Sequence, residues 1–473
     1  PSPSAAPSPS PAPSPSPSPS PPPAPTRASS PTHPASPAHP ASPTRTTAPP
    51  PPPPPATTFA DWPAYQGDIA HSGVAPGPAT SAAPTAAWTS PALDGDDYGE
   101  PVIASGKVIA STENDTVYAF SAATGGQIWF THLGPPEVSS ALPCGDIDPY
   151  TGITSTPVAE VSAGLVYVVA FLRSGTHTLY ALNLATGAIA WSKPADAPGL
   201  NPLTEQQRSA LMLANGYVYV AYGGLYGDCG SYHGAIVAIP VSGAGSAISY
   251  IVPSQNQAGI WAPPGPTIDG SGDLYVATGN SSSQAAYDDG NAVIKLSGAL
   301  QSQAYFAPTN WRQLNTDDLD LGSQSPVLVQ GGYLFQAGKQ GVGYIVSAGN
   351  LGGAGGQVSS GQVCSGAYGG AAYAPPTVYV ACLDGIVAVT VNGSGAMAIA
   401  WRSPRFDAGA PILAYGALWA LDTSSGTLDE INPASGGVLH AVSVPAVAHF
   451  AAPSASGGLV FVASNRSIEA FHA

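Results

Sequence analysis

The 473-residue chain contains 53 Pro and 55 Gly, and only 8% of its residues are charged, against about 25% in an ordinary soluble domain. The first 58 residues hold two Arg and no acid, so the rest of the chain carries 10 basic and 28 acidic residues. A body this acidic repels phosphate backbones and anionic lipid surfaces, which argues against nucleic-acid binding and membrane binding. The longest apolar run near a strand, 165–172, is far too short for a transmembrane helix, so we expect no transmembrane segment.

The N-terminal 58 residues differ sharply in composition from the rest, because they hold 25 of the 53 prolines, mostly in Pro-Ser and Pro-Ala repeats. Proline fixes φ, and Ser and Ala offer little apolar surface to bury, so this segment cannot form a core. We predict a disordered, extended tether over residues 1–58, and consider a ligand for aromatic-lined peptide grooves the less favoured alternative. The numbering opens on Pro1 with no signal peptide, and we expect that an export signal has been removed.

From residue 59 onward the chain is a succession of short β runs bounded by Gly, Asn, Asp and Pro. A turn or two of helix is expected only within 204–214. One unit recurs eight times with a period of about 52 residues, which is close to the blade length of β-propellers. Its middle strands, rich in Val and Tyr, read KVIAST (107–112), LVYVVAF (165–171), YVYVAYG (217–223), DLYVATGN (273–280), YLFQAG (333–338), TVYVACL (377–383), ALWALD (417–422) and LVFVAS (459–464).

The two ends of the repeat region supply an independent indication of a closed ring. The last repeat stops after its third strand, 467–473, and an orphan strand at 85–93 precedes the first full repeat. If this N-terminal strand completes the final blade, no sheet edge is left exposed. We therefore predict an all-β, eight-bladed β-propeller of four-stranded blades over residues 59–473, closed by an N-terminal strand.

Two repeats share a longer motif, AFSAATGGQIW (119–129) and ALNLATGAIAW (181–191), with a decayed copy EINPASGGVLH (430–440). The motif resembles the tryptophan-docking repeat of pyrrolo-quinoline quinone (PQQ)-like propellers, the fold of quinoprotein alcohol dehydrogenases. The resemblance implies that Trp129 and Trp191 pack between blades as structural docking residues. Segments 61–77, 144–158, 228–234 and 337–346 extend it over nearly all of 61–473. Where the family usually has an acid, the three motifs have Ser121, Asn183 and Asn432.

For an active quinoprotein dehydrogenase, the resemblance implies a central-channel site. There PQQ lies between a Trp face and a disulfide ring of adjacent cysteines, Ca²⁺ is held by Glu, Asn and Asp oxygens, and a carboxylate acts as base toward the alcohol. The four cysteines of this chain, Cys144, Cys229, Cys364 and Cys382, are not adjacent, and no CxxCH haem motif is present. We therefore expect no cofactor on the favoured interpretation, and assign PQQ and Ca²⁺ only to the alternative one.

The candidate site residues are single side chains without a diagnostic motif, and none is assigned a catalytic role. Trp261 is expected to begin an innermost strand, facing the channel or packing between blades. The scarce cations are expected either to meet an acidic ligand or to pair with a neighbouring acid. The candidate ligand or channel residues are Arg208, Tyr232, His233, Trp261 and Lys339. Weak metal candidates are Asp288, Asp289 and Asn291, whose simpler interpretation is a polar turn.

The four cysteines are expected to form two disulfides, since an exported chain meets an oxidising environment. We predict Cys144–Cys229 between two inserted loops and Cys364–Cys382 across a hairpin, with four buried thiols as the alternative. The chain has no GxSxG, HExxH, GxGxxG or Walker motif, which disfavours those enzyme classes.

The sequence thus favours an exported, monomeric PQQ-like propeller at the cell surface or outside the cell. Its favoured function is non-catalytic, a binding or scaffold module for a protein or glycan of the cell envelope, since propeller loops vary without disturbing the core. The alternatives are a PQQ-dependent dehydrogenase that oxidises an alcohol or sugar, and a cell-wall glycan-binding module.

Overall fold

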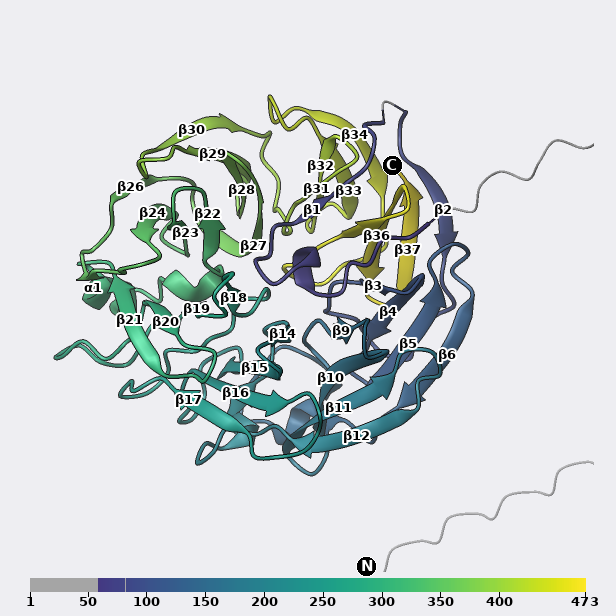
Figure 1. Cartoon of the computed structure of the whole chain (residues 1–473), viewed down its shortest axis with the longest axis horizontal. Coiled ribbons are helices and arrows are strands. Elements are labelled where there is room, and N and C mark those ends of the chain that lie inside the picture. Colours follow the sequence, from purple (N-terminus) through teal and green to yellow (C-terminus); the bar gives the residue numbers. More distant parts are fainter. Residues whose placement is uncertain (1–57, 81) are drawn as a thin grey trace, which may run out of the picture. The chain divides into compact units, whose positions relative to one another are not determined.

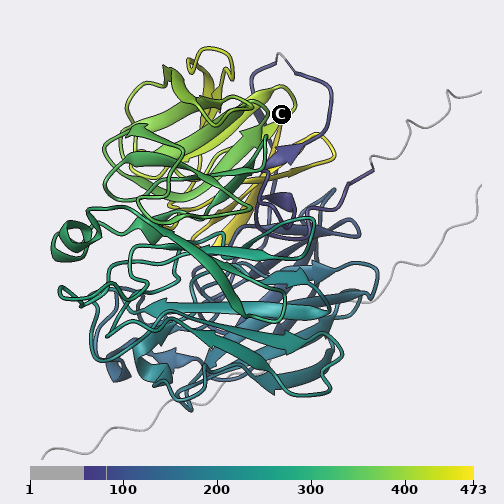
Figure 2. The ribbon, with the colours of Figure 1, turned by 60° about the vertical axis from the view of Figure 1, so that its left-hand side comes forward.

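The computed structural model describes residues 58–80 and 82–473, so the predicted tether lies almost wholly outside the described residues. The described part is a ring of eight β-sheets around a central axis (Figure 1), which confirms the eight-bladed propeller. Neighbouring sheets pack face to face (Figure 2), and the core lies between them. No helix of the described residues is long and apolar enough to cross a membrane.

Each blade runs from an innermost to an outermost strand; in blades 1 to 7 these strands follow the order of the chain, whereas the outermost strand of blade 8 comes from the N-terminal side of the ring. Blades 1 to 4 comprise β3 (Val102–Ala104), β4 (Lys107–Ser111), β5 (Thr116–Ser121) and β6 (Gln127–His132); β9 (Val158–Glu160), β10 (Leu165–Leu172), β11 (Thr176–Asn183) and β12 (Ile189–Pro194); β14 (Met212–Ala214), β15 (Tyr217–Gly224), β16 (Ala235–Pro240) and β17 (Ile248–Ile251); and β18 (Thr267–Ile268), β19 (Leu274–Ala277), β20 (Val293–Leu296) and β21 (Ser302–Ala307).

Blades 5 to 8 comprise β22 (Val327–Val329), β23 (Tyr333–Gln336), β24 (Val342–Ser347) and β26 (Ser359–Gln362); β27 (Ala367–Ala374), β28 (Thr377–Cys382), β29 (Gly385–Val391) and β30 (Met397–Arg402); β31 (Ile412–Ala414), β32 (Ala417–Asp422), β33 (Thr427–Ile431) and β34 (Val438–Ser443); and β35 (Ser454–Ser456), β36 (Leu459–Ser464), β37 (Ser467–His472) and β2 (Thr85–Thr89). The remaining elements are β1 (Val74–Ala75), β7 (Glu137–Val138), β8 (Tyr150–Thr151), β13 (Glu205–Gln206), β25 (Gly353–Ala354), η1 (Tyr65–Gly67), η2 (Ser139–Ala141), η3 (Pro202–Thr204), α1 (Trp311–Thr316) and η4 (Leu321–Ser323).

The burial of each strand follows from its place in the ring. A middle strand such as β10 is covered by a neighbouring blade on both faces, so residues 166–171 are all buried and the strand reads as a continuous apolar run. An outermost strand such as β12 contains no buried residue. The Val- and Tyr-rich runs of the sequence are therefore the middle strands.

The ring is closed by the N-terminal strand, as the sequence predicts. Strand β2 pairs antiparallel with β37, with Thr85 opposite His472 and Thr89 opposite Glu469. Trp88, on β2, donates its indole N–H to the carbonyl of Ala122 in blade 1 at 3.0 Å. The first and last segments of the propeller thereby complete blade 8 and dock it against blade 1.

The two tryptophans of the docking motif, Trp129 and Trp191, also join neighbouring blades. Trp129 donates its indole N–H to the carbonyl of Leu184 at 3.1 Å, and its ring packs on Gly187 in the next blade. A Cβ at Gly187 would lie 2.5 Å from that ring, so only glycine allows this approach. Trp191 packs on Gly243 of the following blade in the same way.

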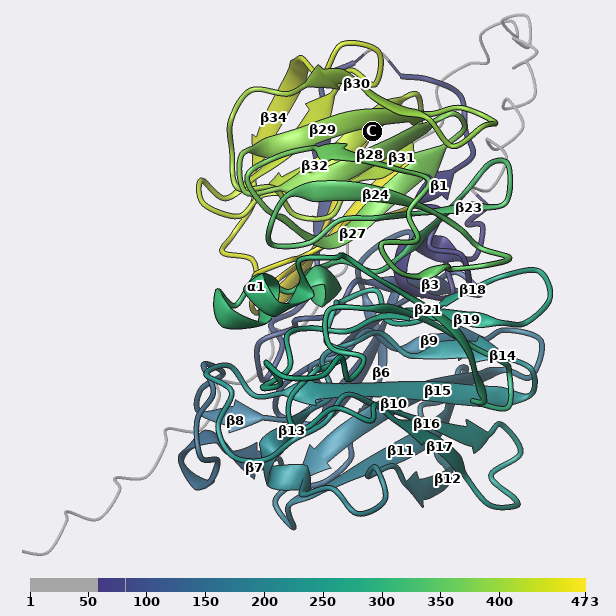
Figure 3. The same cartoon turned by 90° about the vertical axis from the view of Figure 1, so that its left-hand side faces the viewer.

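The segment at 61–75 crosses the centre of the ring and ties blades together that are distant in sequence. Trp62 forms an antiparallel bridge with Ile103 of blade 1. The Gln66 amide donates to the carbonyl of Pro411 at 3.0 Å, and His71 Nε2 lies 3.1 Å from the carbonyl of Pro266. In Figure 3, β1 and β18 lie on one side of the disc, and α1, β7, β8 and β13 on the other.

The helix expected within 204–214 is wrong. The chain there forms β13, whose Glu205 and Gln206 pair with Gly224 and Gly223, and then the innermost strand β14. Pairing with β15 supplies hydrogen bonds that a short helix of ordinary propensity cannot match. The one α-helix of the described residues is α1, which the sequence analysis missed.

We predict that Trp129→Ala lowers the free energy of unfolding by about 3–5 kcal/mol, because it empties the contact between blades 1 and 2. Phe130→Ala, on the same strand, is the matched control, since this side chain is 59% exposed and its removal should cost far less. Urea unfolding followed by tryptophan fluorescence and far-UV circular dichroism measures both. Equal losses in the two variants would contradict the docking role.

Candidate functional site

The loops that lead into the innermost strands meet at one end of the ring, which we call the mouth. Trp261 precedes β18, Asp320 precedes η4 and β22, Tyr368 opens β27, and Phe450 precedes β35. These residues come from four blades, yet Trp261 contacts both Asp320 and Phe450. Closing the ring therefore brings together side chains that are up to 189 positions apart in the sequence.

An indole, a carboxylate and an ammonium group form the centre of the mouth. Trp261 Nε1 donates to Asp320 Oδ2 at 3.2 Å, and Lys339 Nζ lies 2.9 Å from the same oxygen. Lys339 also pairs with Asp318 at 3.0 Å and lies 5.8 Å from the centre of the Trp261 ring. Although burial lowers it, the carboxylates of Asp320 and Asp318 raise the pKa of Lys339 above its usual range. Of the two alternatives for Lys339, pairing with neighbouring acids is the one observed.

Asp320 is held on its other side by the backbone after β19. Its Oδ1 accepts the backbone N–H of Asn280 at 2.6 Å. A Cβ at Gly279 would lie 2.8 Å from that oxygen and 3.4 Å from Trp261 Nε1, so glycine is required for this close approach. The carboxylate is therefore fixed in position by backbone groups.

A second acidic group lies beside Tyr232 in the inserted loop. The Tyr232 hydroxyl donates to Asp228 Oδ1 at 2.5 Å, and the charges of Asp228, Asp320 and Glu205 all act on this phenol, whose pKa is raised first of all by burial. Glu205 is 2% exposed: its Oε1 accepts the backbone N–H of His233, and its Oε2 has no hydrogen-bond partner among the described residues. Burial raises the pKa of Glu205 to about 8.

Aromatic rings form a wall next to Trp261. The Phe450 ring lies 6.1 Å from that of Trp261 and stacks on Tyr368 at 5.5 Å, with 7° between the latter two planes. Phe450 has a φ of +64°, which is rare for an aromatic residue and marks a backbone held in a strained conformation. The strain places the ring at the mouth.

Arg208 lies next to this wall. Its guanidinium donates to the carbonyl of His449 at 3.3 Å, one residue before Phe450. Burial lowers its pKa, and the nearby Tyr65, Glu113, Tyr98 and Asp146 oppose that shift. Within the described ranges, none of the ion pairs involves Arg208.

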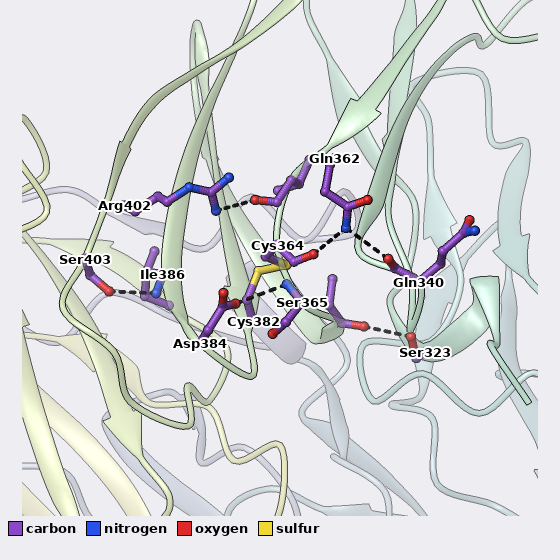
Figure 4. Close-up of a disulfide and its surroundings, with 12 residues drawn as sticks. Ser323, Gln340, Gln362, Cys364, Ser365, Cys382, Asp384, Ile386, Arg402 and Ser403 are labelled. Atoms are coloured by element: carbon purple, nitrogen blue, oxygen red, sulfur yellow. Dashed lines mark hydrogen bonds between the residues drawn. A yellow bond between two sulfur atoms is a disulfide. The ribbon is translucent and has the colours of Figure 1, made fainter.

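Both predicted disulfides form, and each braces a loop of the mouth. Cys144–Cys229 lies directly beside Asp228. Cys364–Cys382 supports the loop that carries Lys339, because the backbone N–H of Cys364 donates to Gly341 and the Gln362 amide joins the carbonyls of Gln340 and Cys364 (Figure 4). Asp384 lies close to these two cysteines, but sulfurs joined in a disulfide provide no thiolate to bind a metal ion.

The weak metal candidates contribute to the local structure. Asp288 accepts hydrogen bonds from Ser281 Oγ and from the backbone of Gln255. Asn291 is fully buried, donating to Asn315 and accepting the backbone N–H of Leu321. Asn291 thereby positions the turn that follows Asp320. The metal site predicted at Asp288, Asp289 and Asn291 stays a prediction, since two of these side chains bond to neighbouring residues of the protein.

Sequence reasoning missed three residues of the mouth: Glu205, Asn280 and Asp320. Two of them lie in recognisable segments of the sequence: Asn280 is the last residue of the run DLYVATGN, and Asp320 lies in the acid-rich run NTDDLDLG. Glu205 was hidden by the helix expected around it. Of the predicted residues, the mouth gathers Arg208, Tyr232, Trp261 and Lys339, while His233 uses Nδ1 at 3.0 Å from Ser254 Oγ and its backbone N–H on Glu205.

Further buried acids surround the segment that crosses the ring. Glu100 accepts the indole N–H of Trp62 at 2.5 Å and the backbone N–H of Gln66 at 3.0 Å. Burial raises the pKa of Glu100 to about 8, of Asp97 to about 8 and of Glu113 to about 7. Asp115 is completely buried, and burial, with the nearby charge of Glu113, raises its pKa to about 9.

The comparisons agree on the fold. Residues 80–297 match the family described as outer membrane protein assembly factor BamB. No curated protein matches the chain in sequence. The structure is similar to the quinohemoprotein alcohol dehydrogenase ADHIIG from Pseudomonas putida HK5, with a TM-score of 0.68 and 15% identity, covering 87% of this chain and 80% of that one.

Two further solved structures are similar. The quinohemoprotein alcohol dehydrogenase from Comamonas testosteroni has a TM-score of 0.61 and 15% identity, over 87% of this chain and 80% of that one. A europium-containing methanol dehydrogenase has a TM-score of 0.66 and 12% identity, over 87% of this chain and 98% of that one. At these identities the likeness establishes the fold, and the function has to be argued from the mouth.

We predict that Asp115→Asn flattens the dependence of stability on pH. The folded protein keeps a proton on Asp115 between about pH 4 and pH 9, whereas the unfolded chain loses it near pH 4. The contribution of the Asp115 proton to the free energy of unfolding is therefore fully present below about pH 4. It is lost as the pH rises toward about 9, by up to about 1.4 kcal/mol per pH unit. Asparagine removes this proton and tolerates the φ of +53° at this position. Urea unfolding at several pH values measures the slope; an unchanged slope would contradict the prediction.

We predict that Cys364→Ala with Cys382→Ala destabilises the protein by about 3 kcal/mol, the value for a short closed loop. The wild type should lose the same amount in a thiol reductant, and the double variant should lose nothing further from this disulfide. Differential scanning calorimetry measures both losses. The Cys144–Cys229 pair is replaced in both proteins, so that only the Cys364–Cys382 disulfide can respond to the reductant. A melting temperature of the wild type that the reductant leaves unchanged would refute it.

Proposed function

We propose that this chain is a PQQ- and Ca²⁺-dependent dehydrogenase oxidising an alcohol or a sugar. The proposal is supported by the PQQ-like propeller fold and by the meeting of Trp261, Asp320 and Lys339 at the mouth. The observation that carries the proposal is the Asp320 carboxylate, held by an indole N–H, a backbone N–H and an ammonium group. The dehydrogenase was the alternative interpretation of the sequence, and this geometry makes us prefer it to the scaffold.

The donor groups of the mouth fit a cation and a flat, anionic cofactor. Glu205 Oε2 is buried and has no hydrogen-bond partner among the described residues, and the side chains of Asn280 and Asp320 offer a carboxamide and a carboxylate, the oxygen ligands that Ca²⁺ prefers. These three residues would hold the ion. The Trp261 face would support the ring of the cofactor, and Lys339 would neutralise its negative charge.

The cofactor, when bound, supplies the acceptor for the two electrons that leave the substrate. The residues of the chain bind, orient and deprotonate. Asp320 would take the proton of the hydroxyl group that is oxidised, because its carboxylate lies at the mouth and the indole and backbone N–H groups hold it in a fixed orientation. Lys339 and Trp261 hold that carboxylate in position, and the wall of Phe450 and Tyr368 limits access of water.

The mouth departs from the family pattern in one respect. The four cysteines form two separate disulfides, so no ring of adjacent cysteines faces Trp261. The groups next to the indole are instead the aromatic rings of Phe450 and Tyr368. Aromatic stacking is a chemically sound support for a flat quinone, so we propose that PQQ is held in this chain without the disulfide ring.

A non-catalytic binding module is the second candidate, and the outermost strands favour it. Phe130 is 59% exposed, and Ile128, Ile189 and Leu439 are each 47% exposed, on the rims of blades 1, 2 and 7. Where such side chains form a contiguous patch, they mark a contact surface for another protein. With either function we propose export and a place at the cell surface, since two disulfides are typical of an oxidising compartment.

The test is calorimetric titration of the full chain with PQQ in the presence of Ca²⁺, followed by a dye-linked assay of alcohol and sugar oxidation. We expect saturable binding and turnover, an Asp320→Asn variant with kcat lower by about 10²–10⁴-fold, and a Glu205→Gln variant with weaker Ca²⁺ affinity. Asp317→Asn, an exposed carboxylate next to the same turn, is the matched control and should leave both unchanged. No binding heat and no turnover would reject the dehydrogenase and leave the binding module.

A further inference from the structure

We propose that the reduced form of this chain binds a thiophilic divalent cation, such as Zn²⁺, through Cys364, Cys382 and Asp384. The sulfur atoms of the two cysteines and a carboxylate oxygen of Asp384 all lie within 4.8 Å of one another. In the oxidised chain the disulfide occupies both sulfurs, so the cross-link and the ion exclude each other. The inference goes beyond the proposed function and does not depend on it, because it concerns a different site and a softer cation than Ca²⁺.

The three ligands belong to segments that backbone hydrogen bonds hold together (Figure 4). Cys382 ends β28 and pairs with Gly385 across a two-residue turn that contains Asp384. Asp384 Oδ1 accepts the backbone N–H of Ser365, the residue after Cys364, at 3.3 Å. None of these hydrogen bonds involves a sulfur atom, so opening the disulfide leaves the three ligands close to their positions.

The segment that carries Cys364 is also held from its other side. The backbone N–H of Cys364 donates to the carbonyl of Gly341 at 3.2 Å, and the guanidinium of Arg402 donates to the carbonyl of Val363. The Cα atoms of the two cysteines lie 6.3 Å apart. Two sulfurs bound to one zinc ion, each about 2.3 Å from it, lie at most about 4.6 Å apart. Rotation of the two side chains therefore provides this spacing on the existing backbone.

The chemistry of the three ligands selects the class of ion. Thiolates are soft ligands that favour zinc-like ions, whereas Ca²⁺ and Mg²⁺ prefer oxygen. Two thiolates and one carboxylate bring three negative charges against the two positive charges of the ion, and the guanidinium of Arg402 lies beside the same loop. Asp384 is half-buried and Leu383 is 45% exposed, so the ion can enter from solvent, and the fourth tetrahedral position is open to water.

The site opens by a two-electron reduction. A dithiol donor breaks the bond between Cys364 and Cys382, each of these sulfurs takes up one electron and one proton, and the donor becomes a disulfide. The ion then displaces the two thiol protons and binds both sulfurs and the Asp384 carboxylate. The bound ion links the Cys364 loop to β28 as the disulfide does. It therefore preserves the brace on the loop that carries Lys339.

The test uses the full chain with Cys144 and Cys229 replaced by alanine, so that only one disulfide remains. The protein is reduced with a dithiol, freed from it in the absence of air, and titrated with Cd²⁺, whose bond to thiolate sulfur gives an ultraviolet charge-transfer band. We expect one bound ion in the reduced chain and none in the oxidised chain. Asp384→Asn should weaken binding by about ten-fold or more. Asp317→Asn, an exposed carboxylate, is the matched control and should leave binding unchanged.

Calorimetry adds a second readout, because an ion that binds the folded state raises the melting temperature. Zn²⁺ should raise the melting temperature of the reduced chain and leave that of the oxidised chain unchanged. Equal binding by both forms, no charge-transfer band in the reduced chain, or an unchanged affinity in Asp384→Asn would each overturn the inference. Binding without a rise in the melting temperature would also overturn it, since the ion would then meet the thiols only in the unfolded chain. None of these outcomes depends on PQQ binding or turnover.

Discussion

The antiparallel pairing of β2 with β37 is the interaction on which the rest of the structure depends, because it turns a row of sheets into a ring. Without it, blade 8 would lack its outermost strand and both ends of the row would be exposed edges. In the closed ring, every innermost strand has its preceding loop at the centre. Trp261, Asp320, Tyr368 and Phe450 can then meet although they belong to different blades.

A chain with 8% charged residues has few charges to place, and several of them are buried at the centre. Removing a charge from water is costly unless a partner of opposite charge or several hydrogen bonds compensate. Asp320 meets this condition with Lys339, Trp261 and the backbone of Asn280, whereas Glu113 and Glu205 each keep one oxygen that no described residue hydrogen-bonds. In a chain with so few charged residues, these two carboxylate oxygens are the positions where a hydrogen bond or a charge from a ligand would stabilise the protein most.

The fold could be predicted from the sequence because packing on both faces forces each middle strand into a long apolar run, as in 165–171, and the ring repeats that run eight times. The mouth could not be predicted to the same extent, because its residues lie in loops whose spacing no period fixes. Trp261 and Lys339 were found as single residues, but their shared partner Asp320 was not, since only the ring brings residues 261, 320 and 339 together. Glu205 was missed because a local helix pattern competed with its pairing to Gly224.

Both disulfides brace loops of the mouth: Cys144–Cys229 joins two inserted loops, and Cys364–Cys382 joins the segment after β26 to the end of β28. The strands are held by ladders of hydrogen bonds and by the cores between blades, while a long inserted loop has few buried apolar contacts and opens at low cost. A site that needs Asp228 and Lys339 at fixed positions therefore depends on the braces at Cys144–Cys229 and Cys364–Cys382. A chain that served only as a rigid disc would gain nothing from bracing these particular loops, because its rim strands are already ordered by pairing. The placement of the two cross-links is thus a further argument that the mouth, rather than the rim, is where this protein acts.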